Sequence, residues 1–117
     1  MATKTSVAHP LSPLLVELIA QRFRVIGEPM RIRLLDHLRT GPASVGALSE
    51  TLGATQQNVS KHLGVLLQAG IVAREKRGNH ALYSIVDESV FELCEQVCGG
   101  LRRRIDELDG VLPVEAA

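Results

Sequence analysis

The feature that most constrains the fold of this chain is a change of hydrophobic period at Gly70. In the preceding stretch, GATQQNVSKHLGVLLQAG, the inward residues recur at helical spacing and are predicted to be Val59, Leu63, Leu66 and Leu67. This spacing predicts a helix with one buried face, capped by Thr55 and ended by Gly70. The next stretch, IVAREKRGNHALYSIV, predicts two short strands joined at Gly78-Asn79. A capped helix that leads directly into a hairpin is therefore expected over residues 55–86.

Helical patterns also surround this unit. We expect further helices over residues 13–25, 29–39, 45–52 and 88–109. Pro29 suits the first turn of its helix, and Ser44 is a good N-cap. The inward residues of the second helix are predicted to be Ile32, Leu34, Leu35 and Leu38, and its outward residues Arg31, Arg33 and Arg39.

The order of these elements is that of a winged helix-turn-helix. Residues 45–69 give a helix, a tight turn that contains glycine and a second helix, and the hairpin that follows is the wing. The predicted fold class is mainly α with a small β-hairpin, with about five helices plus a two-stranded wing. We expect a flexible N-terminal arm over residues 1–12, one winged helix-turn-helix domain over 13–109 and a C-terminal tail over 110–117.

The composition favours a small core that is completed by a second copy of the chain. A length of 117 residues fits one domain. Apolar residues make up 45% of the sequence and aromatic residues only 3%, so the core must be aliphatic. The apolar faces of the first and last helices would suit a dimer interface: Leu14, Leu15, Leu18, Ile19 and Phe23, then Val90, Cys94, Val97, Cys98, Leu101, Ile105 and Leu108. We therefore expect a homodimer.

The formal net charge of zero conceals an uneven distribution. Residues 1–80 contain 10 Lys and Arg against 5 Asp and Glu, whereas residues 81–117 contain 3 against 8. Such an asymmetry is compatible with a basic binding surface and an acidic end that points away from it.

We expect neither a signal peptide nor a membrane-spanning segment, because no long apolar run follows Lys4. Its two cysteines lie four residues apart and do not make a disulfide framework. A reducing cytoplasm is the expected compartment.

The predicted helix over residues 56–69 has an unusual polar face. Its first half carries hydrogen-bonding side chains and no carboxylate: Gln56, Gln57, Ser60, Lys61 and His62. A DNA major groove admits one helix, whose N-terminal half reaches the bases, and glutamine can bond both N6 and N7 of adenine. The hairpin tip adds Lys76, Arg77 and Asn79, where they could meet the phosphate backbone. Either segment alone would be typical of an ordinary solvated surface, but in this order they favour binding to double-stranded DNA.

The motifs resemble those of the ArsR/SmtB winged-helix repressors. PMRIRLLDHL is similar to the family's Pro-x-Arg-x-x-Ile-Leu-x-x-Leu helix, and VSKHLGVLLQAGIV to its Ser-x-His-Leu-x-x-Leu-x-x-Ala-Gly-Leu-Val block. REKRGNHALYSI resembles the family's wing, and the likeness covers about residues 14–109. The resemblance implies a homodimeric repressor of a near-palindromic operator, with the first and last helices at the dimer interface. The DNA contacts that it implies are Gln56, Gln57, Ser60, Lys61, His62, Arg74, Lys76, Arg77 and Asn79, with Arg31 as a weaker phosphate contact. His62 has the alternative role of buttressing its helix.

Members of this family typically release DNA when a metal, a metalloid or a thiol-reactive signal binds. The segment VGALSETLGA lacks the family's Cys-x-Cys of arsenic and cadmium sites, and no His pair follows Asp87 in the last helix. Cys94 and Cys98 remain, on one face of that helix, as possible ligands for a soft metal or metalloid ion or as targets of an oxidant or reactive sulfur. The alternative is that both thiols only fill the interface.

Two other functions stay open at this point. The first is an effector-independent DNA-binding regulator, and the second is a winged-helix module that binds protein. An enzyme is not expected, because the sequence lacks a phosphate-binding glycine loop, an HExxH motif and a nucleophile elbow.

Overall fold

The computed structural model describes residues 7–110 and contains five helices and one hairpin. The helices are α1 (Pro13–Ile26), α2 (Pro29–Leu38), α3 (Val45–Leu52), α4 (Gln56–Gln68) and α5 (Glu88–Asp109), and the strands are β1 (Val72–Arg77) and β2 (His80–Ile85). These bounds confirm the predicted fold class. Residues 1–6 of the predicted arm (1–12) and residues 111–117 of the predicted tail (110–117) lie outside the described residues.

Short polar side chains begin four of the helices. Ser12, Ser44, Thr55 and Asp87 each accept a hydrogen bond from a backbone N–H in the first turn of α1, α3, α4 and α5, respectively. Such caps satisfy N–H groups that have no partner inside the helix. The predicted starts of α3 and α4 are correct because Ser44 and Thr55 occupy these positions.

The hairpin is an antiparallel pair whose register runs from Val72 opposite Ile85 to Arg77 opposite His80. Gly78 makes the turn with a φ of 62°, a conformation that glycine adopts without steric cost. The base of the hairpin is joined to the loop before α3, because Ala43 and Tyr83 exchange two backbone hydrogen bonds of 3.0 and 2.8 Å.

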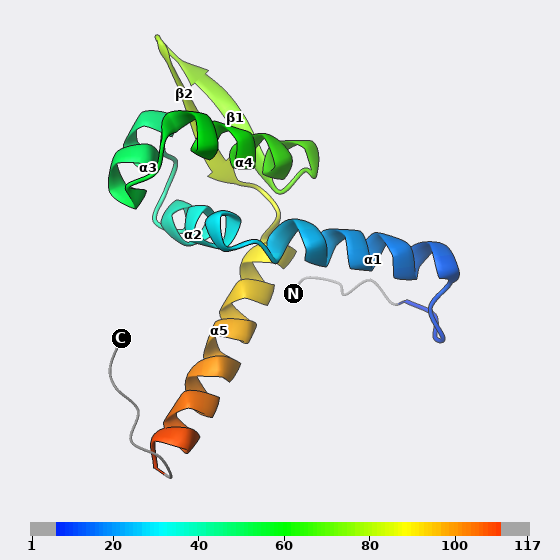
Figure 1. Cartoon of the computed structure of the whole chain (residues 1–117). Helices are drawn as coiled ribbons and strands as arrows, with labels where there is room; N and C mark the ends of the chain where they lie inside the picture. Colours follow the sequence, from blue (N-terminus) through cyan, green and yellow to red (C-terminus); the bar gives the residue numbers. More distant parts are fainter. Residues whose placement is uncertain (1–6, 111–117) are drawn as a thin grey trace, which may run out of the picture.

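The body of the molecule consists of α2, α3, α4 and the hairpin, and α1 and α5 project from it in different directions (Figure 1). Its core is aliphatic apart from Tyr83, and the fully buried side chains are Leu34, Val59, Leu63, Leu66, Ile71 and Val72. Two predicted inward residues are exceptions, since Ile32 and Leu67 are exposed. Among the described residues, no helix has both the length and the apolar character needed to cross a membrane.

The apolar faces of the projecting helices are mostly uncovered in the single chain. On α1 the buried residues are Val25 and Ile26, near its junction with α2. On α5 only Val90 is buried. The exposed apolar residues of the two helices are Leu14, Val16, Leu18 and Phe23, and Val97, Leu101, Ile105 and Leu108.

Candidate functional site

The first half of α4 presents its polar side chains to solvent. The exposed members of the predicted set are Gln56, Gln57, Ser60 and Lys61. Thr55 closes the helix start by accepting from the N–H of Asn58 at 3.1 Å, and Gly53, with a φ of 64°, makes the tight turn from α3. Within residues 7–110, no hydrogen bond or ion pair engages the side chains of Gln57, Ser60 or Lys61. They are free to bond an external partner.

His62 lies on the opposite side of α4, against the junction of α1 and α2. Its side chain is buried, and Arg31 Nη1 donates to its Nδ1 at 3.0 Å, while Glu28 Oε2 lies 3.5 Å from the same nitrogen. Arg31 also donates from Nε to the carbonyl of Val25 at 2.6 Å and from Nη2 to that of Arg24 at 3.3 Å. This geometry corrects the expectation that Arg31 and His62 face outward, and it favours the buttressing role for His62.

The wing residues divide between the two faces of the hairpin. Alternation along β1 places Arg74 and Lys76 on the face that carries the buried Val72, and Glu75 and Arg77 on the other. Arg77 Nε donates to Glu75 Oε1 at 2.9 Å, and both side chains are exposed. Glu75 partly neutralises Arg77. The wing cations better suited to phosphate are therefore Arg74 and Lys76. Asn79 is exposed in the turn.

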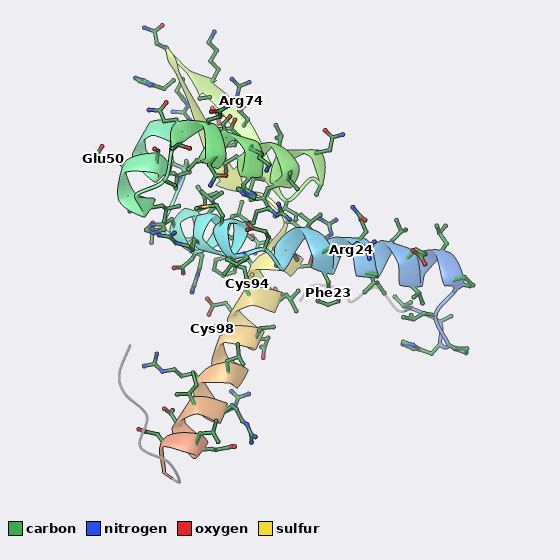
Figure 2. All side chains as sticks on the ribbon, in the orientation of Figure 1. Phe23, Arg24, Glu50, Arg74, Cys94 and Cys98 are labelled. Atoms are coloured by element: carbon green, nitrogen blue, oxygen red, sulfur yellow. The ribbon has the colours of Figure 1, made fainter. Side chains whose placement is uncertain are left out.

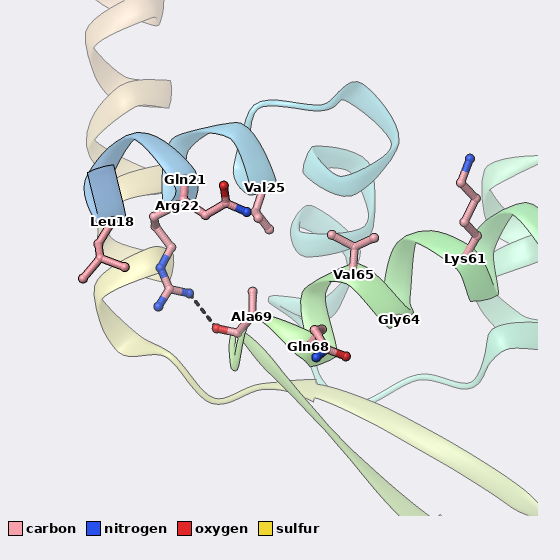
Figure 3. Close-up of a pocket in the computed structure, with 9 residues that line it drawn as sticks. All are labelled: Leu18, Gln21, Arg22, Val25, Lys61, Gly64, Val65, Gln68 and Ala69. Atoms are coloured by element: carbon pink, nitrogen blue, oxygen red, sulfur yellow. Dashed lines mark hydrogen bonds between the residues drawn. The ribbon is translucent and has the colours of Figure 1, made fainter. Parts of the chain in front are cut away.

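A hollow of about 710 Å³ lies between α1 and the second half of α4 (Figure 3). Arg22 borders it and donates from Nη1 to the carbonyl of Ala69, which caps the C-terminal end of α4, at 3.0 Å. The same Nη1 lies 3.7 Å from Asp87 Oδ2 at the start of α5. Arg22 therefore connects both projecting helices to the end of α4.

The two thiols border a second cavity, of about 290 Å³, between α2, β2 and the first half of α5. Figure 2 shows Cys94 nearer the body and Cys98 farther along α5. Cys94 is half-buried and packs against the core of its own chain, whereas Cys98 is exposed. Burial raises the pKa of the Cys94 thiol, an effect that the nearby Arg39 partly opposes.

Arg39 is, with Arg33, one of the two cations that line this cavity, and other groups already engage it. Its guanidinium lies 5.4 Å from the centre of the Phe91 ring and forms ion pairs with Asp36 and Glu95. In the described part of the chain, no group of three or more His, Cys, Asp or Glu side chains is arranged to hold a metal ion.

The comparisons with known proteins agree with this architecture. The profile of a helix-turn-helix domain family matches residues 26–75. The chain is 41% identical over 80 residues to the HTH-type transcriptional regulator Rv0081 of Mycobacterium tuberculosis, a match that covers 68% of this chain and 70% of that protein. It is 30% identical over 86 residues to the arsenical resistance operon repressor of Bacillus subtilis, a match that covers 72% of this chain and 82% of that repressor. The chain belongs to the ArsR/SmtB family.

Solved structures give the same result for the fold of this ArsR/SmtB protein. The crystal structure of Rv0081 from Mycobacterium tuberculosis matches with a TM-score of 0.74 at 36% identity, over 82% of this chain and 97% of that one. The homodimeric winged helix-turn-helix domain Mb0332 from Mycobacterium bovis matches with a TM-score of 0.75 at 22% identity, over 86% and 95%. The protein is thus a DNA-binding transcriptional regulator and not an enzyme.

Sequence reasoning missed the two arginines that connect the helices. Arg22 and Arg31 both donate to main-chain carbonyls, and Arg22 reaches a carbonyl 47 residues away. No local pattern predicts a bond of that range. For Arg31 a signal was available, since it precedes Leu34 and Leu35 by three and four residues and so shares their buried face.

Proposed function

We propose that this ArsR/SmtB regulator is a cytoplasmic homodimeric repressor that binds a near-palindromic operator and is released by a thiol-directed signal. The observation that carries the proposal is the polar, carboxylate-free first half of α4. This half of α4 lies on the body of the molecule, beside a wing that carries cations, and its exposed polar side chains have no partners among the described residues.

Base contacts are assigned to Gln56, Gln57 and Ser60, and phosphate contacts to Lys61, Arg74 and Lys76. Gln and Ser side chains can donate to and accept from base edges in the major groove, and a capped helix start also favours a nearby phosphate. Arg77 and Asn79 at the wing tip are weaker members of this set, because Glu75 competes for the Arg77 guanidinium. Arg31 and His62 are assigned to support α4.

The homodimer is proposed from the exposed apolar faces of α1 and α5. Monomeric proteins rarely leave large apolar patches in water, so these faces suit an interface. The similar fold of Mb0332 is homodimeric, which supports the same arrangement. A twofold axis would place two α4 helices about one helical turn of DNA apart, about 34 Å, in successive major grooves.

The signal is assigned to Cys94 and Cys98. Thiolates bind soft ions such as As(III) and react with oxidants and reactive sulfur, and the arsenical resistance repressor is a relative. Two thiols are too few for a closed four-ligand site in one chain. The second candidate, a regulator that responds to no effector, is favoured by the half-burial of Cys94, which is typical of a structural cysteine.

An electrophoretic mobility shift with DNA from upstream of the gene tests this proposal. The protein should bind that fragment more tightly than random DNA. Arsenite or a mild oxidant should weaken binding by about 5–150-fold, the range of typical coupling free energies. The Cys94→Ser/Cys98→Ser variant should bind equally well and should not respond. Loss of specificity for the fragment contradicts the repressor, and an unchanged response of the variant contradicts the thiol site.

A further inference from the structure

The cavity beside the thiols has mostly apolar walls. Ile32 and Leu35 of α2, Ile85 of β2, and Val90 and Phe91 of α5 line it together with the two cysteines. Ile32, one of these lining residues, is 49% exposed. A volume of about 290 Å³ suits a small organic molecule of a few carbon atoms more than a single ion.

Three charged side chains, Arg33, Asp36 and Arg39, also line the cavity, and together with Glu95 they carry no net charge. Arg39 pairs with Asp36 and Glu95. Arg33 donates from Nη2 to the carbonyl of Leu52 at 3.0 Å and so closes the C-terminal end of α3. An ionic ligand would therefore meet no net counter-charge on leaving water, a costly step, whereas an uncharged apolar ligand has no such cost.

The two thiols have different surroundings. In the single chain Cys98 is exposed and borders the cavity, so its Sγ can reach a ligand that occupies the apolar walls. Cys94 is half-buried, and burial raises its pKa, so at neutral pH it stays protonated and acts as part of the wall.

We propose that the cavity between α2 and α5 binds a small uncharged α,β-unsaturated carbonyl compound, such as a quinone or an enal, and that Cys98 adds to it. The Cys98 thiol first loses its proton to water. Its Sγ then forms a bond to the β-carbon, the C=C π bond breaks, and its electron pair moves toward the carbonyl oxygen. Water returns a proton to the α-carbon, so no oxidant or reductant is consumed.

The link from this adduct to DNA rests on the proposed function. An adduct that fills the cavity would push the first half of α5 away from α2. The N–H groups of Val86 and Asp87 both donate to the carbonyl of Ile71, just after α4, at 3.0 and 3.3 Å. Asp87 also pairs with Arg22, which donates to the carbonyl of Ala69. A displacement of α5 therefore reaches the end of the DNA-reading helix directly.

The test is a homologous series of uncharged maleimides, N-methyl, N-ethyl and N-propyl, with the full-length native protein. Rate constants at Cys98 are measured by intact mass spectrometry with peptide mapping. If the cavity binds the alkyl group, each added methylene should raise the rate about two- to fourfold, as expected for burial of one CH₂. The unfolded protein should show a flat series.

Ile32→Phe adds bulk to a wall of the cavity without changing either thiol and should flatten the series. Val86→Phe adds similar bulk at an exposed position that does not line the cavity, and it should leave the series unchanged. A flat series in the native protein, faster labelling of Cys94 than of Cys98, or no labelling of Cys98 would overturn the inference. A graded series whose adduct leaves operator affinity unchanged would support the binding site and count against release through these thiols. A flat series together with arsenite-induced release would count against the binding site and support release through these thiols.

Discussion

The body and the two projecting helices have similar apolar periodicity, but they bury their apolar residues to different extents. In the body, Leu34, Leu63 and Leu66 are 0% exposed. On the projecting helices, Leu14 is 70% exposed and Leu101 58%. The pattern in the sequence predicts which residues avoid water but not which molecule covers them. Apart from Ile32 and Leu67, the body covers its predicted apolar residues within one chain, whereas the apolar faces of α1 and α5 suit a second surface.

The largest expected effect separates these regions by stability. Leu66→Ala opens a cavity in the body and should lower the free energy of unfolding by about 2–5 kcal/mol. Leu101→Ala removes an exposed side chain and should affect unfolding mainly through dimerisation. Urea denaturation at two protein concentrations measures both variants. If both variants lost the same free energy of unfolding at both protein concentrations, the body and the projecting helices would not differ in how they are stabilised.

Leu101→Glu should break the dimer while leaving the body folded. Placing a carboxylate in an apolar interface removes about 2 kcal/mol of burial from each chain and adds a desolvation cost, so dimerisation should weaken at least a hundredfold. Sedimentation velocity measures the mass, and circular dichroism confirms the helices. A variant that stays fully dimeric would place the interface elsewhere.

Gln57→Ala, a change in the body, should weaken DNA binding without affecting the projecting helices. Loss of a bidentate base contact costs about 1–3 kcal/mol of discrimination, so specific affinity should fall about 5–150-fold while dimerisation is unchanged. Gln68→Ala, an exposed glutamine at the other end of α4, is the matched control and should have little effect. Fluorescence anisotropy with operator and random duplexes measures the specific and non-specific affinity of both variants. Equal losses on both duplexes would exclude Gln57 from base readout.

The wing provides a finer comparison within the body. Lys76→Ala should reduce the slope of log affinity against log salt by about 0.9, the value for one phosphate contact. Arg77→Ala should reduce it less, because Glu75 already pairs with Arg77. Titrations at several salt concentrations measure the slopes, and a larger change for Arg77 would reverse the assignment of the two wing faces.

The smallest effect concerns the joint between the body and α5. The pKa of Asp87 is lowered chiefly by its hydrogen bond from the Ser89 hydroxyl, with weaker help from backbone N–H groups and Arg22. Its stabilisation is therefore present above the ordinary Asp pKa and is lost as pH falls through the lower folded-state value. Asp87→Ala should cost about 1 kcal/mol at neutral pH, as for other helix caps, and the difference from the parent should shrink in acid. Urea denaturation across pH 2–7 checks the trend, and a constant difference would assign no role to the charge.

Helix and hairpin bounds were predictable because local residues determine them. Ser44 and Thr55 cap their helices, and Gly70 and Gly78 adopt positive φ angles of 74° and 62° at the ends of α4 and β1. The exposed polar half of α4 was predictable for a similar reason, since no apolar residue interrupts Gln56, Gln57 and Asn58.

The exact buried face of each helix was not predictable. His62 lies inside, three residues after Val59 and four before Leu66, and the predicted inward residue Leu67 is exposed. Likewise Arg31 is turned inward on α2, where Ile32 was expected. The two displaced polar residues bond each other, so each depends on a partner that is distant in the sequence. Helical spacing can place such residues on the buried face, but it cannot show that Arg31 and His62 compensate each other there.

The central claim is that α1 and α5 join two chains so that two copies of α4 read one operator. Sedimentation velocity of the protein alone and with a labelled operator duplex tests it most directly. We predict a protein mass of about twice 12.7 kDa and two chains on each duplex. A protein that sediments as a 12.7 kDa monomer and places one chain on each duplex would contradict the claim.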